Sequence, residues 1–296
     1  MKNFSEIILI FFAVSAFLVV SCTERIDIKT DNAPPRVVIY GYITTDTISV
    51  SITRSAGYFT TERPEGVSNA RVTITDCAEN EIALTENDKT PGLYHAAPKV
   101  YGAEGKTYTL DIELYSGEQY QATAYLQHVH HIDYIELRPS TFPMFSNHVE
   151  VLLYAHNYEQ RNFYSIFVAI NDVVVNSNIN RFFVLDNTFF REEYINGEPC
   201  YWLNQNPHHE YRNEVLRIGD KVTLNINAIS QEYATFISNV QSEIRGSNPI
   251  FGGPPANVPT NIKRIYPKDG IPPVGFFTAF PSRYAHAIVT EELFRN

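Results

Sequence analysis

The sequence predicts a mostly β protein, in which an N-terminal immunoglobulin-like β-sandwich precedes a second β-rich domain with one amphipathic helix. Between residues 36 and 127, short segments of alternating apolar and polar residues recur with turn signals between them. Neighbouring side chains of a strand point to opposite faces, so this alternation gives each strand one apolar face. About seven such strands in succession are typical of an immunoglobulin-like sandwich. The 19 tyrosines and 19 phenylalanines, against 2 methionines, also favour strands.

The first domain is expected at residues 36–127. Its first strand, at residues 37–43, is apolar at nearly every position, which favours a strand that is buried on both faces or lies at a domain join. Pro91-Gly92 and Ser116-Gly117 supply turns between later strands. The alternating segments are residues 48–53, 70–75, 107–114 and 120–126.

The second domain is expected at residues 128–296, where the pattern is coarser. Residues 187–213 are polar and aromatic without clear periodicity, and a segment of this length is either a functional loop or an insertion. Strands are predicted at residues 132–137, 149–154, 164–170, 181–185 and 222–229.

Residues 230–244 predict the amphipathic helix. Tyr233, Phe236 and Ile237 begin an apolar stripe at helical spacing. Ser230 is suited to cap the N-terminus, since its side-chain oxygen can accept from a free backbone N–H. We interpret the stripe as core packing, because a lone amphipathic helix in a β domain has a sheet to cover.

The N-terminal region predicts a membrane anchor. Residues 7–20 are apolar except for Ser15, and the run is shorter than the roughly 20 residues of a spanning helix. Ser21-Cys22 ends it and resembles a bacterial lipobox. This likeness implies that residues 1–21 are a removed signal peptide, that Cys22 carries acyl chains in the outer membrane, and that residues 22–35 are a tether. The alternative is an ordinary secretory signal with a chance cysteine.

The net charge of the chain argues against two kinds of binding partner. The formal net charge is −10, which argues against nucleic acid, because phosphate binding needs a basic surface. It also argues against a protein that lies flat on anionic lipid. Once Cys22 is acylated, Cys77 and Cys200 remain, and an oxidising compartment would permit a bridge between them. Both a bridge and two separate thiols stay open.

The ordered combination of the lipobox with later motifs resembles the domain of unknown function 4249 family of Bacteroidota envelope lipoproteins. The first block is Ala70-x-Val72-x-Ile74 through Gly92-x-Tyr94 to Gly105-x-x-Tyr108-x-Leu110. The second is Ser247-Asn248-Pro249, Asn261-Ile262 and Gly275-Phe276-Phe277. The family has no assigned enzymatic activity, and the resemblance implies an accessory role, at the surface or in the periplasm, beside a TonB-dependent outer-membrane receptor. No cofactor is expected.

The stretch at residues 247–262 is interpreted as structural. Its proline and glycine content excludes regular helix and central strand. Short asparagine side chains can hydrogen-bond nearby backbone, so we expect Asn248, Pro249 and Asn261 to fix this loop against the second domain. Gly275 is expected to allow a close approach of two backbone segments.

The sequence contains few groups that suggest chemistry. His128 and His130 would share one face of a strand and could bind a metal, but junction residues on a solvent face are the favoured interpretation. No metal site and no catalytic residue are predicted. Tyr194, Tyr201 and Trp202 are candidates for partner binding, because aromatic side chains anchor interfaces. The alternative is that these aromatics pack inward as a local core.

The function expected from these observations is that of a non-enzymatic outer-membrane lipoprotein, an accessory or ligand-capture partner of a TonB-dependent receptor. A structural surface protein or adhesin is the alternative, and a hydrolase that uses the histidines is a third hypothesis.

Overall fold

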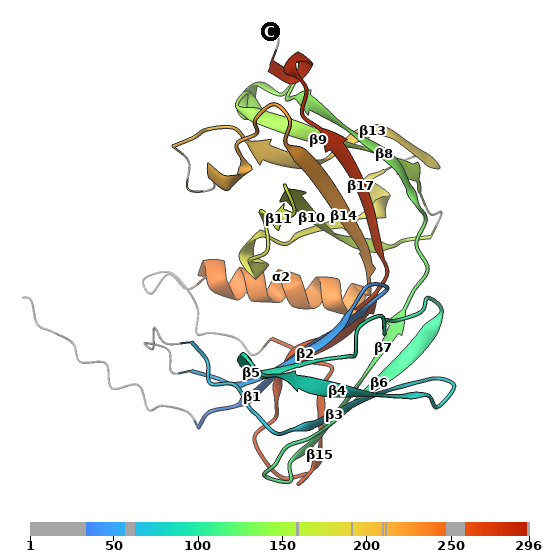
Figure 1. Ribbon diagram of the computed structural model, residues 1–296, viewed down its shortest axis with the longest axis vertical. Coiled ribbons are helices and arrows are strands. Elements are labelled where there is room, and N and C mark those ends of the chain that lie inside the picture. Colours follow the sequence, from blue (N-terminus) through green and yellow to red (C-terminus); the bar gives the residue numbers. More distant parts are fainter. Residues whose placement is uncertain are drawn as a thin grey trace, which may run out of the picture. The chain divides into compact units, whose positions relative to one another are not determined.

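The structure is a computed structural model, and it describes residues 34–56, 63–157, 160–190, 192–208, 210, 212–246 and 258–294. The chain from Pro35 onward forms one compact unit. It is mostly β, with one α-helix among the described residues, as the sequence predicts (Figure 1). Cys22, Asn248 and Pro249 lie outside the described residues. No described helix is both long and apolar enough to cross a membrane.

The first sheet has nine strands in the order β15-β7-β6-β3-β4-β5-β2-β1-β16. It curls so that β16, at one end, lies close to β7 near the other end, and the apolar inner face encloses one core in a sandwich-like arrangement (Figure 1). Seven strands, β1 to β7, lie before residue 127, where about seven were expected. The bounds are β1 (Val37–Thr44), β2 (Ile48–Arg54), β3 (Arg71–Asp76), β4 (Glu81–Asn87), β5 (Thr90–His95), β6 (Lys106–Glu113), β7 (Gln119–Leu126), β15 (Lys263–Tyr266) and β16 (Val274–Phe280).

Two further sheets enclose a second core. One has the order β13-β9-β8, and the other has the order β11-β10-β14-β17 with β12 paired to β10. Their bounds are β8 (Ile132–Pro139), β9 (His148–His156), β10 (Phe163–Ile170), β11 (Val173–Val174), β12 (Phe183–Asp186), β13 (Tyr194–Asn204), β14 (Lys221–Ile229) and β17 (Ser282–Ile288). Short 3-10 turns are η1 (Pro143–Phe145), η2 (Ile179–Arg181), η3 (Asn187–Phe189), η4 (Arg212–Glu214) and η5 (Glu291–Phe294).

The chain returns to the first sheet near its end. β16 pairs in parallel with β1, from Val38 opposite Val274 to Thr44 opposite Phe280, and β15 pairs with β7. These two strands therefore belong to the first sheet and not to the second body of the fold, where residues 128–296 were expected to lie together. The domain boundary after residue 127 stays a prediction.

The first strand, β1, has two different faces. Ile39 and Ile43 point into the first core and are fully buried, whereas Tyr40 and Tyr42 point outward and are half-buried. The nearly continuous apolar run therefore reflects a strand whose second face lies at the join between the two bodies of the fold.

Helix α2 (Gln231–Gly246) confirms the predicted helix and its cap. The Tyr233 backbone N–H donates to Ser230 Oγ at 3.1 Å. Tyr233, Phe236 and Ile237 are buried against Phe276 of β16, so the apolar stripe is core packing.

The prediction of a long irregular segment at residues 187–213 is wrong, because its middle is the eleven-residue strand β13. The pairing of β13 with β9 shifts register twice, between Asn196 and Glu198 and between Pro199 and Tyr201. Each bulge moves the following side chains to the other face, so the alternation that would reveal a strand is lost.

Candidate ligand-binding cleft

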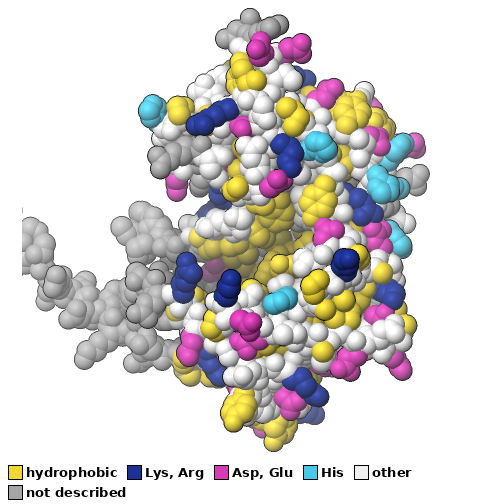
Figure 2. Space-filling model, in the orientation of Figure 1, with side chains coloured by type: hydrophobic (Ala, Val, Ile, Leu, Met, Phe, Trp, Pro, Cys, Tyr) yellow, Lys and Arg dark blue, Asp and Glu magenta, His cyan; other side chains and the backbone are white. Residues whose placement is uncertain are grey.

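A cleft of about 390 Å³ lies where the outward faces of two sheets meet. β1 and the end of β16 form one wall, β10, β14 and β17 form the other, and α2 contributes Tyr233. Figure 2 shows this cleft as a hollow with hydrophobic side chains on its walls. Its volume lies within the roughly 300–1,000 Å³ range of small-molecule sites. The lining residues are Tyr40, Tyr42, Thr44, Asp46, Thr47, Ser165, Phe167, Val168, Ala169, Val174, Phe182, Thr223, Asn225, Asn227, Tyr233, Phe280, Ser282 and Tyr284.

Aromatic rings make up much of the first wall. Tyr42 stacks with Phe280, with ring centroids 6.5 Å apart and planes at 22°. Phe280 in turn stacks with Tyr233 at 6.4 Å and 10°. The hydroxyl of Tyr40 hydrogen-bonds the hydroxyl of Tyr233 and so ties this wall to the helix.

The second wall presents two polar rows across its strands. In the first row, Asn225 of β14 lies opposite Phe167 of β10 and Tyr284 of β17. In the second row, Asn227 lies between Ser165 and Ser282. These positions alternate with the core residues of the same strands, so an ordinary period-two pattern places them in the cleft.

The side chains of the second row, around Asn227, hydrogen-bond one another. In the first row, Asn225 keeps one unpaired group. Ser282 Oγ donates to Asn227 Oδ1 at 2.8 Å, and Asn227 Nδ2 contacts the Ser165 carbonyl oxygen at 3.4 Å. The side chain of Asn225 hydrogen-bonds Tyr284, but its buried Oδ1 has no hydrogen-bond partner among the described residues.

Contacts between the walls hold the cleft in shape. At one end the Tyr284 hydroxyl donates to Asp46 Oδ2 at 2.6 Å, and the Ser282 backbone N–H donates to Thr45 Oγ1 at 3.1 Å. A further contact links the two bodies of the fold: the Gln127 side chain, just after β7, donates to the carbonyl of Ile229 at the end of β14 at 3.1 Å. The cleft is therefore a fixed feature of the fold.

The cleft is almost without charge. Burial raises the pKa of Tyr40 and raises that of Tyr233 well above its ordinary value, because both hydroxyls lie out of water. Burial, with the bond to Asp46, raises the pKa of Tyr284 to about 12. These phenols are therefore neutral near pH 7. Among the described lining residues Asp46 is the one carboxylate, and none is a lysine, arginine, histidine or cysteine.

This lining is suited to binding and offers little for catalysis. Serine or threonine hydroxyls need an adjacent general base to act as nucleophiles. The Ser165 and Ser282 side chains instead hydrogen-bond the neutral amide of Asn227. The arrangement can stack a ring against aromatic side chains and hydrogen-bond neutral polar groups.

The three aromatic residues singled out in the sequence have different surroundings. Tyr201 is 8% exposed and belongs to the second core, so it offers little surface to a partner. Tyr194 is half-buried beside His156, with ring centroids 5.1 Å apart. Trp202 is half-buried and lies 6.1 Å from the ring of Phe145. Partner binding by Tyr194 and Trp202 stays a prediction.

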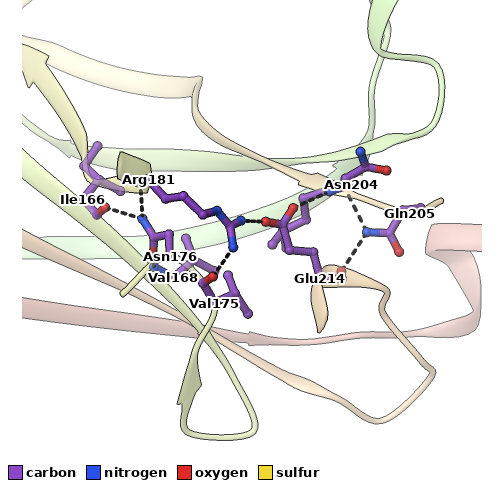
Figure 3. Close-up of polar contacts among 9 residues, drawn as sticks. Ile166, Val168, Val175, Asn176, Arg181, Asn204, Gln205 and Glu214 are labelled. Carbon is purple, nitrogen blue, oxygen red and sulfur yellow. Dashed lines mark hydrogen bonds and ion pairs between the residues drawn. The ribbon is translucent and has the colours of Figure 1, made fainter. Parts of the chain in front are cut away.

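A buried polar network holds the end of β13, close to Tyr201 and Trp202. Arg181 is paired with Glu214, whose other oxygen accepts from the Asn204 backbone N–H at 2.8 Å. Asn176 accepts from the Val168 N–H at 3.0 Å and donates to the Ile166 carbonyl at 2.9 Å. Figure 3 shows that Arg181 lies between these two groups. Removing one partner of a buried ion pair leaves an uncompensated charge, so the network is structural.

Asn261 and Gly275 occupy the structural roles expected of them, with one correction. Asn261 Nδ2 donates to the Phe277 carbonyl at 2.7 Å, and the Phe277 N–H donates to Asn261 Oδ1 at 2.9 Å. Both contacts, and one to the Thr123 carbonyl at 3.3 Å, fix the loop to the first sheet and not to the second domain. The expectation was wrong because β16 and β7 belong to the same sheet.

Gly275 confirms the expected close approach of two backbones. Its φ is +108°, and a Cβ there would lie 1.9 Å from the Ile39 carbonyl oxygen. Only glycine fits such a position, so this residue permits the parallel pairing of β16 with β1.

The cysteines and histidines among the described residues form no cluster that could hold a metal. Cys77 is exposed and Cys200 is buried, and neither forms a disulfide. Burial raises the pKa of the Cys200 thiol to about 12. His128 lies 3.2 Å from Glu104, and within the described ranges no group of three or more potential ligands could hold a metal.

The cleft residues were missed in the sequence because most of them lie on strands whose other face is core. The signal was present in the polar positions of the strand at residues 222–229 and in Tyr40 and Tyr42 of the first apolar run. The cleft itself could not be recognised, because the wall that faces β1 comes from strands more than a hundred residues away in the chain.

The structure is that of a β-rich protein with a nearly uncharged, aromatic cleft. The chain belongs to the family described as "Domain of unknown function (DUF4249)", whose model matches residues 23–283. A search of curated proteins gave no match.

Proposed function

We propose that this protein is a non-enzymatic lipoprotein of the outer membrane that captures a small ligand in the cleft and serves a TonB-dependent receptor. The observation that carries the proposal is the preformed aromatic cleft, held at its rim by the bond from Tyr284 to Asp46. Largely preformed, mostly apolar cavities with a few polar groups are the usual form of ligand sites. The described lining residues include one carboxylate and neither histidine nor cysteine, a composition that favours binding over hydrolysis.

Capture is tested on the lipidated protein, purified from membranes of its native cells in detergent. Native mass spectrometry should show a small molecule bound to the protein. Thr223→Trp, which places a large ring in the cleft, should remove that bound mass. Thr85→Trp is the matched control, because Thr85 is exposed on β4 outside the cleft lining. Equal occupancy of the two variants would refute capture in the cleft.

Anchoring through Cys22 rests on the apolar run of residues 7–20 and the Ser21-Cys22 pair. Acylation by two or more chains gives stable membrane attachment, since each buried CH₂ contributes about 0.8 kcal/mol. Cys22→Ser should abolish acyl labelling and release the protein from membranes. Cys77→Ser is the control, since Cys77 is exposed and should not affect labelling. Unchanged labelling of the Cys22 variant would contradict the anchor.

The receptor contact is proposed on the outer side of the three-stranded sheet. Tyr134 of β8, 46% exposed, stacks on Tyr154 of β9 at 4.2 Å and 14°, and Tyr194 of β13 lies on the neighbouring strand. Exposed aromatics of this kind are enriched at interface hot spots. Tyr134→Ala with Tyr194→Ala should reduce co-purification of the receptor from solubilised membranes. An undiminished yield of receptor would place the contact elsewhere.

The same aromatic surface is what favours the alternative, a structural surface protein or adhesin. Under that alternative the aromatic surface would be needed for attachment, and the cleft would be empty in protein from native cells. The native mass spectrum therefore separates the two functions.

A further inference from the structure

The polar groups that the fold leaves unsatisfied inside the cleft bear on the kind of ligand. Buried polar groups in proteins are nearly always hydrogen-bonded, and an unpaired one destabilises the fold. Asn225 Oδ1 is a buried acceptor with no partner among the described residues. It lies in the row between Phe167 and Tyr284, on the cleft wall.

The tyrosine pair leaves an unmet donor. Only one of the Tyr40 and Tyr233 hydroxyls can donate into the bond between them. The hydrogen of the other hydroxyl has no acceptor among the hydrogen bonds of the described residues. The cleft therefore has an acceptor on one wall and a donor on the other, and a hydroxyl-bearing ligand can satisfy both.

The charges of the lining exclude other ligand classes. An anionic ligand such as a phosphate or a carboxylate would meet no cationic side chain among the described lining residues. A cation would find one carboxylate, Asp46, which is exposed at the rim and already accepts from Tyr284. A neutral ligand costs least to transfer into this site.

The shape of the lining favours a ring. Tyr42 and Phe280 form a stacked pair on one wall, and Phe167 and Tyr284 flank Asn225 on the other. Aromatic faces bind apolar ring faces, and a hydroxyl or amide at the ring edge can be hydrogen-bonded at the same time. Thr47 and Thr223 add hydroxyls that can both donate and accept, whereas the Thr44 hydroxyl is already bonded to the backbone of Asp46 and Thr47.

We infer that the cleft binds a neutral saccharide, with one face of a sugar ring on Tyr42 and Phe280 and a sugar hydroxyl donating to Asn225 Oδ1. This inference rests on the proposed capture function and names its ligand class. Asn225 and the Tyr40–Tyr233 pair are then specificity-determining groups, since they distinguish a hydroxylated ring from a purely apolar one.

The test is isothermal titration calorimetry of the full lipidated protein in detergent with a fixed set of probes. The neutral probes are glucose, galactose, maltose and cellobiose. Glucuronate and glucose 6-phosphate are their charged analogues, and indole is a flat apolar probe. At least one neutral saccharide should bind, and the charged analogues should bind at least tenfold more weakly.

Three variants locate the site. Asn225→Ala should weaken saccharide binding about tenfold, the loss expected for one hydrogen bond in a desolvated site. Tyr42→Ala should weaken it by a similar factor through lost stacking. Asn196→Ala is the matched control, because Asn196 is exposed on β13 and should leave binding unchanged.

The outcomes separate this inference from the function on which it rests. Saccharide binding that Asn225→Ala leaves untouched, or tighter binding of the charged analogues, overturns the saccharide assignment. Binding of indole alone, lost in Thr223→Trp, overturns the saccharide class but supports capture in the cleft. Binding of no probe, together with an empty native mass spectrum, overturns both.

Discussion

Asn261→Ala should destabilise the protein by about 2–4 kcal/mol, because one side chain satisfies two backbone groups of β16. The Phe277 N–H and carbonyl both face away from β1 and toward Asn261, at 2.9 and 2.7 Å. Phe277 is fully buried, so the alanine variant leaves this donor and this acceptor in poor contact with water. Leaving one buried group unsatisfied costs about 1–3 kcal/mol. Residue 261 is half-buried, so water can partly reach the two Phe277 groups and lowers their combined cost.

Urea denaturation measures this loss as a fall in the transition midpoint at an unchanged slope. Asn261→Asp sharpens the test, because it keeps the acceptor for the Phe277 N–H and loses the donor for its carbonyl. We expect its stability to lie between those of the wild type and the alanine variant. Asn196→Ala, at an exposed position, should change little. A loss below about 0.5 kcal/mol for Asn261→Ala, the range of ordinary surface substitutions, would refute this account of how β16 is held.

Other predictions address the same sheet and the second core. Gly275→Ala should destabilise by several kcal/mol or prevent folding, since its Cβ would lie 1.9 Å from the Ile39 carbonyl oxygen; a soluble variant with wild-type thermal stability would contradict the close approach. The hydrogen bond from the Lys106 ammonium at 2.5 Å, with those from Asn80, holds the pKa of Asp76 well below its ordinary value of 3.8. That stabilisation is present above about pH 4 and is lost as pH falls through the folded-state pKa, so Asp76→Asn should flatten the acid limb of a stability–pH curve. Tyr201→Ala should cost about 3–5 kcal/mol in a urea melt, as for a buried aromatic, while Tyr194→Ala should cost much less; equal losses would show that Tyr194 is also core.

Sequence reasoning recovered the features that local pattern determines. Period-two alternation identified β2, β3, β6 and β7 of the first sheet, and helical spacing with Ser230 at the cap identified α2, because each pattern reflects one apolar face. The backbone constraint at Gly275 was also readable, since few residue types tolerate such a position. The strand β13 was not, because its two bulges disturb the alternation on which strand prediction depends.

The cleft could not be predicted, since it depends on which strands meet. Tyr42 and Asn225 are outward-facing residues on well-predicted strands, and outward residues are ordinarily solvated. The parallel pairing of β1 with β16 joins residues more than two hundred positions apart, and no local pattern specifies such a pair. With that pairing, the outer face of the first sheet lies against the outer face of the sheet that contains β10, β14 and β17.

β16 therefore links the stability of the fold with the ligand binding proposed for the cleft. Its middle is held by Asn261, its start requires Gly275, and its last residue, Phe280, stacks with Tyr42 on the cleft wall. A loosened β16 would keep both main cores, since most of their strands pair elsewhere, yet it would displace an aromatic ring from the site. Loss of ligand binding should accordingly precede global unfolding when β16 is weakened, because the strand belongs to the first sheet while its end lines the cleft.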